Sequence, residues 1–128
     1  MNVLFHAHSG VRYLVLLIGL MVALHAAIRM VRGRPFDETA RRFGVAFAVT
    51  MDVQLVLGLV LLFLWPFDPQ LIGHITMMVL AVAVAHLAPA LNRRRPPERK
   101  SLGLQLFGTV GALVLVIGGI LAIQRPIL

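Results

Sequence analysis

The 128-residue chain contains no cysteine and few acidic residues. Without cysteine it forms neither disulfides nor thiolate metal sites, and it cannot attach haem covalently as c-type cytochromes do. Asp and Glu together number 5, and charged residues of both signs make up 13% of the chain, whereas 59% is hydrophobic. A water-soluble domain of this size needs a more polar surface. The composition therefore predicts a protein embedded in a lipid bilayer.

Four long apolar stretches account for most of the chain. They cover roughly residues 5–31, 42–65, 71–91 and 102–124. Each is close to the ~20 residues with which a helix crosses the hydrocarbon core. Membrane spans must satisfy their own backbone hydrogen bonds, and runs this long without alternation are not barrel strands. Because the connections are short, we expect one all-α domain over residues 1–128, an up-down four-helix membrane bundle.

The basic residues are concentrated in two of the connections. Five arginines lie in or near the first connection and five basic residues in or near the third, whereas Arg12 and Arg125 lie elsewhere. This distribution follows the positive-inside rule, and it predicts both basic loops in the cytoplasm and both termini outside. Membrane lipids with anionic headgroups are the expected contacts of these loops, and no nucleic-acid ligand is expected.

Prolines and acidic residues predict where helices begin and end. Pro35 is expected in the first turn of the second helix, with Asp37 and Glu38 near its positive dipole end. Pro96 and Pro97 prevent the third helix from continuing. The fourth span contains five glycines and almost no polar side chains, which predicts close packing against its neighbours.

Polar side chains inside the spans are few, and each is a candidate for function because its placement in lipid is costly. The set is His6, His8, Arg12, His25, Asp52, His74 and His86, with Gln54 and Gln105 as neutral companions. In an up-down bundle the first and third helices run parallel. His8 and His74, each about one turn from its outer helix end, are therefore expected at one depth. Two imidazoles approaching an iron at one level from opposite sides are suitable ligands for haem b.

The residues around this pair suit a haem pocket. Arg12 follows His8 by four residues on the same helical face and could neutralise a haem propionate. Met77 and Met78 would pack against the porphyrin edge. Simpler roles stay open, because histidine is common at a membrane interface and Arg12 can extend to the lipid headgroups. His6 is the alternative to His8 as a ligand.

A second haem, held near the cytoplasm by His25 and His86, has less support. His8 and His25 are 17 residues apart, whereas His74 and His86 are 12 apart. If His8 and His74 lie at one depth, His25 and His86 therefore differ in depth by about 7.5 Å. Opposite helical rotations also aim both inner histidines toward the same side of the helix pair. We expect one haem and interpret His86 as a hydrogen-bonding or proton-carrying group.

Asp52 and Gln54 fall near the middle of the second span. A carboxylate at that depth is costly unless it is neutral or paired. Asp52 is therefore either a proton carrier or the partner of an imidazole or a quinone head group. The structural alternative is an interhelical hydrogen bond, for which Gln54 and Thr50 are equally suited. Gly58 would let a neighbouring helix or a flat ring approach closely.

Three segments, HSGVR, DVQLVLGLVLLF and GHITMMVLAVAVAHLAP, resemble a family of small four-helix bacterial membrane proteins usually labelled cytochrome b-like. The matching positions are His8, Ser9, Arg12, Asp52, Gln54, Gly58, His74, Met77, Met78 and His86. The chain departs from the family pattern at Ile75, where proline is frequent, at Tyr13, where tryptophan is typical, and at Asp52, where some relatives have histidine. The resemblance covers most of the first three helices. It implies a haem-binding, multi-pass protein of the bacterial cytoplasmic (inner) membrane.

Two classes of function follow from these observations. The first is an electron-transfer protein with one haem b, held by His8 and His74 and contacted by Arg12 and Met78, that works with quinol or a larger respiratory-type complex. The second is a cofactor-free accessory subunit of a respiratory or photosynthetic complex. Either protein would assemble with larger subunits or with copies of itself.

A third class is a proton or metal conduit, entered at His6, His8 and His74 and continued through Asp52 and His86. Copper transport has little support because thiolates are missing and methionines are not clustered at the outer surface. We expect no stand-alone catalysis, because the chain has no nucleophile–base pair and no phosphate-cradling glycine loop. Quinol oxidation near Arg12, Tyr13 and Gln54 is the one enzymatic possibility.

Overall fold

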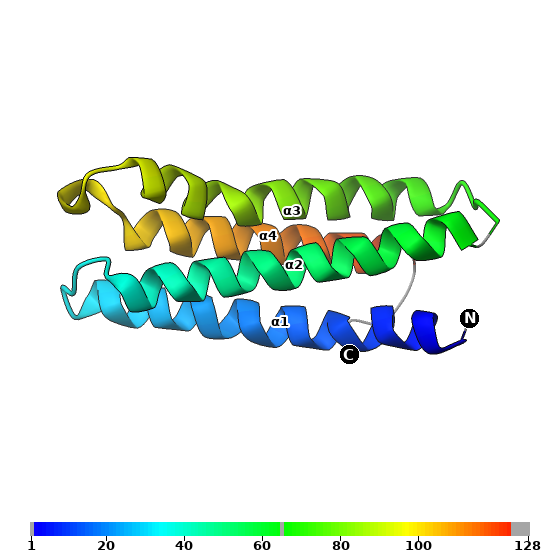
Figure 1. Ribbon diagram of the computed structural model, residues 1–128, viewed down its shortest axis with the longest axis horizontal. Coiled ribbons are helices and arrows are strands. Elements are labelled where there is room, and N and C mark those ends of the chain that lie inside the picture. The colour runs from blue at the N-terminus through cyan, green and yellow to red at the C-terminus, as the bar shows by residue number, and fades with distance from the viewer. Residues whose placement is uncertain (1, 65, 124–128) are drawn as a thin grey trace.

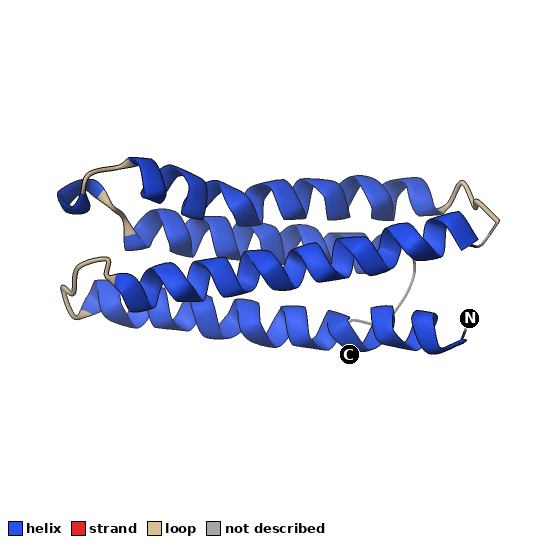
Figure 2. Cartoon of the chain, viewed as in Figure 1, coloured by secondary structure: helices blue, strands red, loops and turns tan. Residues whose placement is uncertain are grey.

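The computed structural model describes residues 2–64 and 66–123, and it consists of helices joined by short loops. The helices are α1 (Asn2–Val31), α2 (Glu38–Leu64), α3 (Leu71–Arg94), the 3-10 helix η1 (Pro97–Arg99) and α4 (Leu102–Ala122). The four α-helices run up and down (Figure 1), and no strand occurs within the described residues (Figure 2). All four are long and apolar enough to cross a membrane. The predicted all-α four-helix bundle is confirmed.

The bundle is a four-cornered arrangement in which α1 and α3 stand on one diagonal. Each of these two helices packs against both α2 and α4, while α2 and α4 touch each other only slightly. The closest packing is between α3 and α4, where a Cβ on Gly108 would lie 3.2 Å from Ala88 Cβ. A Cβ on Gly111 would likewise lie 3.4 Å from Val84 Cγ1. The close packing predicted for the glycine-rich span is therefore present.

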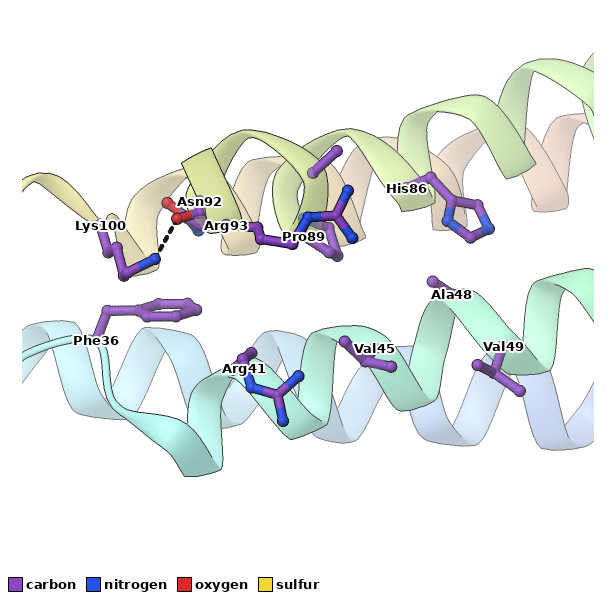
Figure 3. Close-up of a pocket in the computed structure, with 11 residues that line it drawn as sticks. Phe36, Arg41, Val45, Ala48, Val49, His86, Pro89, Asn92, Arg93 and Lys100 are labelled. Atoms are coloured by element: carbon purple, nitrogen blue, oxygen red, sulfur yellow. Dashed lines mark hydrogen bonds between the residues drawn. The ribbon is translucent and has the colours of Figure 1, made fainter. Parts of the chain in front are cut away.

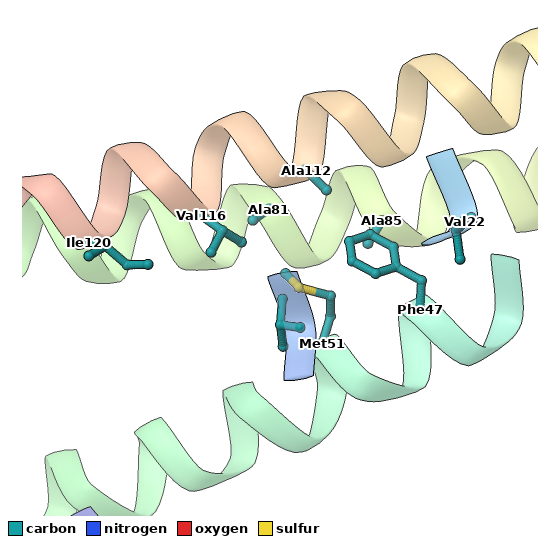
Figure 4. Packing of buried hydrophobic residues seen from close by; sticks show 9 residues of the cluster. Val22, Phe47, Met51, Ala81, Ala85, Ala112, Val116 and Ile120 are labelled. Atoms are coloured by element: carbon teal, nitrogen blue, oxygen red, sulfur yellow. The ribbon is translucent and has the colours of Figure 1, made fainter. Parts of the chain in front are cut away.

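Buried apolar side chains from all four helices form the centre of the bundle (Figure 4). They are Val15, Val22, Phe47, Met51, Ala81, Ala85, Ala112, Val116 and Ile120. Large apolar side chains also cover the outside, among them Leu17, Leu20 and Leu24 of α1, each more than half exposed. These outward-facing apolar side chains are suited to contact with lipid tails.

The start of α2 differs from the prediction. The helix begins at Glu38 and not near residue 42, because Asp37 caps it: the Asp37 Oδ1 accepts a hydrogen bond from the Ala40 N–H at 3.0 Å. Pro35 therefore lies in the loop and not in the first helical turn, where it was expected. Asp37 also forms an ion pair with Arg29 of α1, which ties the two helices together at this end.

The third helix continues through Pro89 and ends at Arg94, three residues beyond the predicted end. Its last turn is fastened to α4 by Asn92, which is 2% exposed. Asn92 donates through Nδ2 to the Ser101 carbonyl at 3.1 Å and accepts from the Ser101 N–H at 2.9 Å. Ser101 in turn caps α4, since its Oγ accepts from the Leu104 N–H. The first and fourth predicted spans also differ at their ends, and Trp65 and Arg125 lie outside the described residues.

Candidate functional site

His8 of α1 and His74 of α3 face each other across the bundle diagonal. Their ring centroids are 6.5 Å apart and their planes are inclined at 85°. Two imidazoles bound to one metal ion through nitrogens about 2 Å from it place their ring centres about 6 Å apart. The separation of these rings therefore suits a metal centre between them.

His74 makes a hydrogen bond of a kind that is common among metal-binding histidines. Its Nδ1 lies 2.8 Å from the carbonyl oxygen of Gly119 in α4. Because a carbonyl only accepts, Nδ1 carries the hydrogen and Nε2 keeps its lone pair. Histidine ligands of metals usually donate their second nitrogen to such a carbonyl or carboxylate, which fixes both the tautomer and the ring. His74 is thus prepared to coordinate through Nε2.

The two histidines border a cavity of about 440 Å³ at the end of the bundle that holds the start of α1, which we call the outer cavity. Small-molecule and cofactor sites run from about 300 to about 1,000 Å³, so the volume is in the usual range. The lining is mostly apolar, and its residues from the predicted site are His8, Ser9, Arg12, Gln54, Gly58, His74 and Met78. The cavity therefore collects residues from α1, α2 and α3 that the sequence patterns had singled out.

Three buried polar atoms around this cavity have no hydrogen-bond partner among the described residues. They are His8 Nδ1, Arg12 Nε and Gln54 Oε1. Leaving a buried polar group unpaired costs about 1–3 kcal/mol, so three of them at one cavity favour a polar or metal-containing ligand there. Arg12 also donates to the Tyr13 hydroxyl at 2.8 Å and lies 4.7 Å from the centre of that ring.

Helix α2 positions His8 from the side. Gln54 donates through Nε2 to the His8 carbonyl at 2.9 Å, which is the interhelical hydrogen bond considered for this residue. A Cβ on Gly58 would lie 3.2 Å from His8 Cε1, so the absence of a side chain there makes room for the imidazole. The Thr50 hydroxyl instead donates to the Ala46 carbonyl within its own helix, α2.

Asp52 and His86 form a separate pair between α2 and α3. His86 Nε2 lies 2.7 Å from Asp52 Oδ1, and their side chains are 47% and 45% exposed. Of the partners considered for Asp52, the structure contains the imidazole. Gln54, two residues from Asp52, points instead to α1 and the outer cavity. The structure therefore separates Gln54 from the Asp52–His86 pair.

The remaining two histidines lie apart from both pairs. His6 packs edge-on against Phe5 with ring centroids 5.9 Å apart, and it is not among the residues that line the outer cavity. His25 packs against Phe43 of α2 at 4.3 Å. Both inner histidines, His25 and His86, contact α2 and not each other, and the structure brings no second pair of facing imidazoles together within the described residues.

Two features of the structure were missed by the sequence analysis, one at the site and one outside both cavities. The Gly119 carbonyl is a backbone group, so no side-chain pattern indicates that it orients His74. Gln105 was noted only as a polar companion, yet it is 1% exposed and packs against Gly44, with its Nε2 lacking a partner among the described residues. Gly44 was the available signal in the sequence, because only a residue without a side chain leaves room for the Gln105 amide there.

A haem iron and a bare metal ion differ in the number of protein ligands that they need. A bare transition-metal ion usually takes three or four protein ligands, and no cluster of three His, Cys, Asp or Glu side chains occurs in the described part of the chain. A haem iron needs at most two, because the porphyrin supplies the others.

Comparisons with protein-family models, with curated proteins and with solved structures find no match to this chain. The resemblance to cytochrome b-like proteins stays a prediction.

Proposed function

We propose that the protein binds one haem b between His8 and His74 and transfers electrons in the bacterial inner membrane. The observation that carries the proposal is the facing pair of imidazoles, 6.5 Å apart, with His74 held in the ligating tautomer by Gly119. A bound haem b supplies a one-electron carrier. Quinol or a larger respiratory-type complex is the proposed redox partner.

The residues around the pair have distinct roles in this proposal. His8 and His74 are the iron ligands, and the unpaired Nε of Arg12 offers a hydrogen bond and a positive charge to a carboxylate of the cofactor. Met78 adds an adaptable apolar wall. Gln54 and Gly58 are positioning residues, since each acts on the cofactor through His8.

A reduced-minus-oxidised absorption spectrum tests the proposal. The protein, expressed with haem supply and purified in mild detergent, is expected to show the sharp α-band of haem b after dithionite reduction. His8→Ala and His74→Ala each remove the band, because neither single imidazole holds the iron from both sides. His6→Ala and His25→Ala are matched controls that retain it.

Two results would overturn the proposal. One is a colourless protein that takes up no added haemin, which together with copurified larger subunits would favour a cofactor-free accessory role. The other is a band that survives in His8→Ala and His74→Ala while His25→Ala or His6→Ala abolishes it.

A further inference from the structure

A second cavity, of about 300 Å³, lies between α2 and α3 in the half of the bundle that carries the basic loops (Figure 3). It shares no lining residue with the outer cavity. His86 lines its deep end, and Val45, Val49 and Pro89 are among its apolar walls. Its mouth is cationic, with Arg41, Arg93 and Lys100. This inner cavity is therefore an amphipathic site separate from the proposed haem pocket.

His86 lines the deep end of this cavity and is paired with Asp52, which does not line it, and the pair is incompletely satisfied. Only one atom of each side chain is used in their 2.7 Å contact, and His86 Nδ1 and Asp52 Oδ2 have no hydrogen bond within the described residues. Both side chains are nearly half exposed, at the middle of α2 and in the second half of α3. Lipid tails provide no hydrogen bonds, so this exposure is costly unless a polar ligand covers the pair.

The chemistry of the pair selects a ligand that donates hydrogen bonds. With Asp52 ionised and the imidazole neutral, the Nε2–H donates to Oδ1, and Nδ1 keeps a lone pair. The free atoms, Nδ1 and Oδ2, are then both acceptors. The ligand must also be apolar enough to enter from the bilayer and lie against Val45, Val49 and Pro89.

We propose that the inner cavity binds a membrane quinol, with a ring hydroxyl donating to His86 Nδ1, while Asp52 holds the imidazole from the other side. A quinol combines an apolar ring and tail with hydroxyl donors, whereas the oxidised quinone has only carbonyl acceptors. The pair therefore favours the reduced form. Quinol binding in this cavity does not depend on the haem, but the role of the quinol as electron donor rests on the proposed function.

An anionic phospholipid is the rival occupant, because its phosphate would suit the cations at the mouth. Arg93 has no ion pair among the described residues, and the Lys100 Nζ donates to the Asn92 carbonyl. However, an acyl chain reaching the deep end would leave His86 Nδ1 against hydrocarbon. The unsatisfied pair thus favours the quinol.

Equilibrium binding of a short-chain benzoquinol tests the site. Decylubiquinol and decylubiquinone are titrated separately, without oxygen, into the purified full chain in neutral-lipid nanodiscs. We expect tighter binding of the quinol, and a loss of about tenfold or more in His86→Leu. Asp52→Asn replaces the carboxylate that fixes the Nε2–H tautomer by an amide that can donate as well as accept, so it should weaken the preference for the quinol over the quinone. A purely structural role of Asp52 would lower both affinities alike and leave the preference unchanged.

Control variants separate this proposal from its rival and from the haem. Arg94→Gln, at a neighbouring exposed position that does not line the inner cavity, should leave quinol affinity unchanged, and His74→Ala should abolish the haem spectrum without changing quinol binding. Undetectable quinol binding by the wild type, or equal binding by wild type, His86→Leu and Asp52→Asn, would overturn the proposal. So would retention of phosphatidylglycerol that Arg93→Gln abolishes together with quinol binding, because the mouth would then be the recognition element.

Discussion

His74 and Gly119 are joined by a hydrogen bond of 2.8 Å between the imidazole Nδ1 and the backbone carbonyl. The bond connects the beginning of α3 to the end of α4. Helix α4 contributes no side chain with an ionisable group to the outer cavity. Its Gly119 carbonyl nevertheless engages Nδ1 of His74, and the proposed iron ligand therefore depends on close α3–α4 packing.

Gly119→Ala should disturb this packing. The added Cβ would lie 3.2 Å from Met77 Cβ and would collide with Met78 Cε. Overpacking of this kind lowers the free energy of unfolding by about 1–3 kcal/mol, and the movement of α4 should also reduce haem content. Unfolding in mixed SDS micelles, followed by circular dichroism, measures the first effect and the α-band measures the second. Gly118→Ala is the control, since its nearest neighbour, Met77 Sδ, is 4.0 Å away; equal damage at both glycines would contradict the prediction.

Gly58→Ala should displace His8, the proposed iron ligand, with little effect on the fold. Its Cβ would lie 3.2 Å from His8 Cε1, and an imidazole on a rotatable side chain can shift by a few tenths of an ångström. We expect a destabilisation below about 1 kcal/mol with an altered electron paramagnetic resonance spectrum of the oxidised haem. Gly10→Ala, with open space around its Cβ, should leave the spectrum as in the wild type. An unchanged spectrum in Gly58→Ala would argue against His8 as the ligand.

Asn92→Ala should loosen the α3–α4 connection. The side-chain amide satisfies both the N–H and the carbonyl of Ser101, and it is 2% exposed. Truncation leaves both backbone groups without these partners, at a cost of about 1–3 kcal/mol in the free energy of unfolding. The same SDS titration measures the loss. Arg93→Ala, at the neighbouring exposed position, should change stability much less, and a comparable loss there would count against the Asn92 contacts.

Asp37 should make stability depend on acid pH. The hydrogen bond from the Ala40 N–H, and then the nearby Arg29 guanidinium, lower the pKa of the Asp37 carboxyl below its usual value. Since the folded-state pKa lies below the unfolded one, the stabilisation is complete above the unfolded pKa and is lost as the pH falls through the lowered folded-state value.

The melting temperature in detergent between pH 2 and pH 7 checks this behaviour. Asp37→Ala should lower the melting temperature at pH 7 and lose part of the acid dependence, because the cap and the ion pair are both removed. Thr39→Ala, exposed on the same helical turn, is the control. A melting temperature of Asp37→Ala equal to that of the wild type at pH 7 would contradict the role of the cap.

Much of the fold follows from local properties of the chain. The number of spans and their antiparallel order depend on the lengths of the apolar runs and of the loops, which a sequence displays directly. The same counting placed His8 and His74 at one depth, and the structure brings their rings together. The start of α2 was misjudged because Pro35 and Asp37 are both start signals, and the hydrogen bond that Asp37 makes decided between them.

The partners of the polar residues were decided only by the tertiary structure. Asp52 and Gln54 are two residues apart, so they lie about 200° apart around α2, and the neighbours on each side determine that one meets His86 and the other the His8 carbonyl. Every peptide unit has a carbonyl group, so the sequence does not single out that of Gly119. Only the packing of α4 on α3 brings it to His74. Sequence periodicity sets where a side chain lies on its own helix. The rotation and spacing of the other three helices set what it touches.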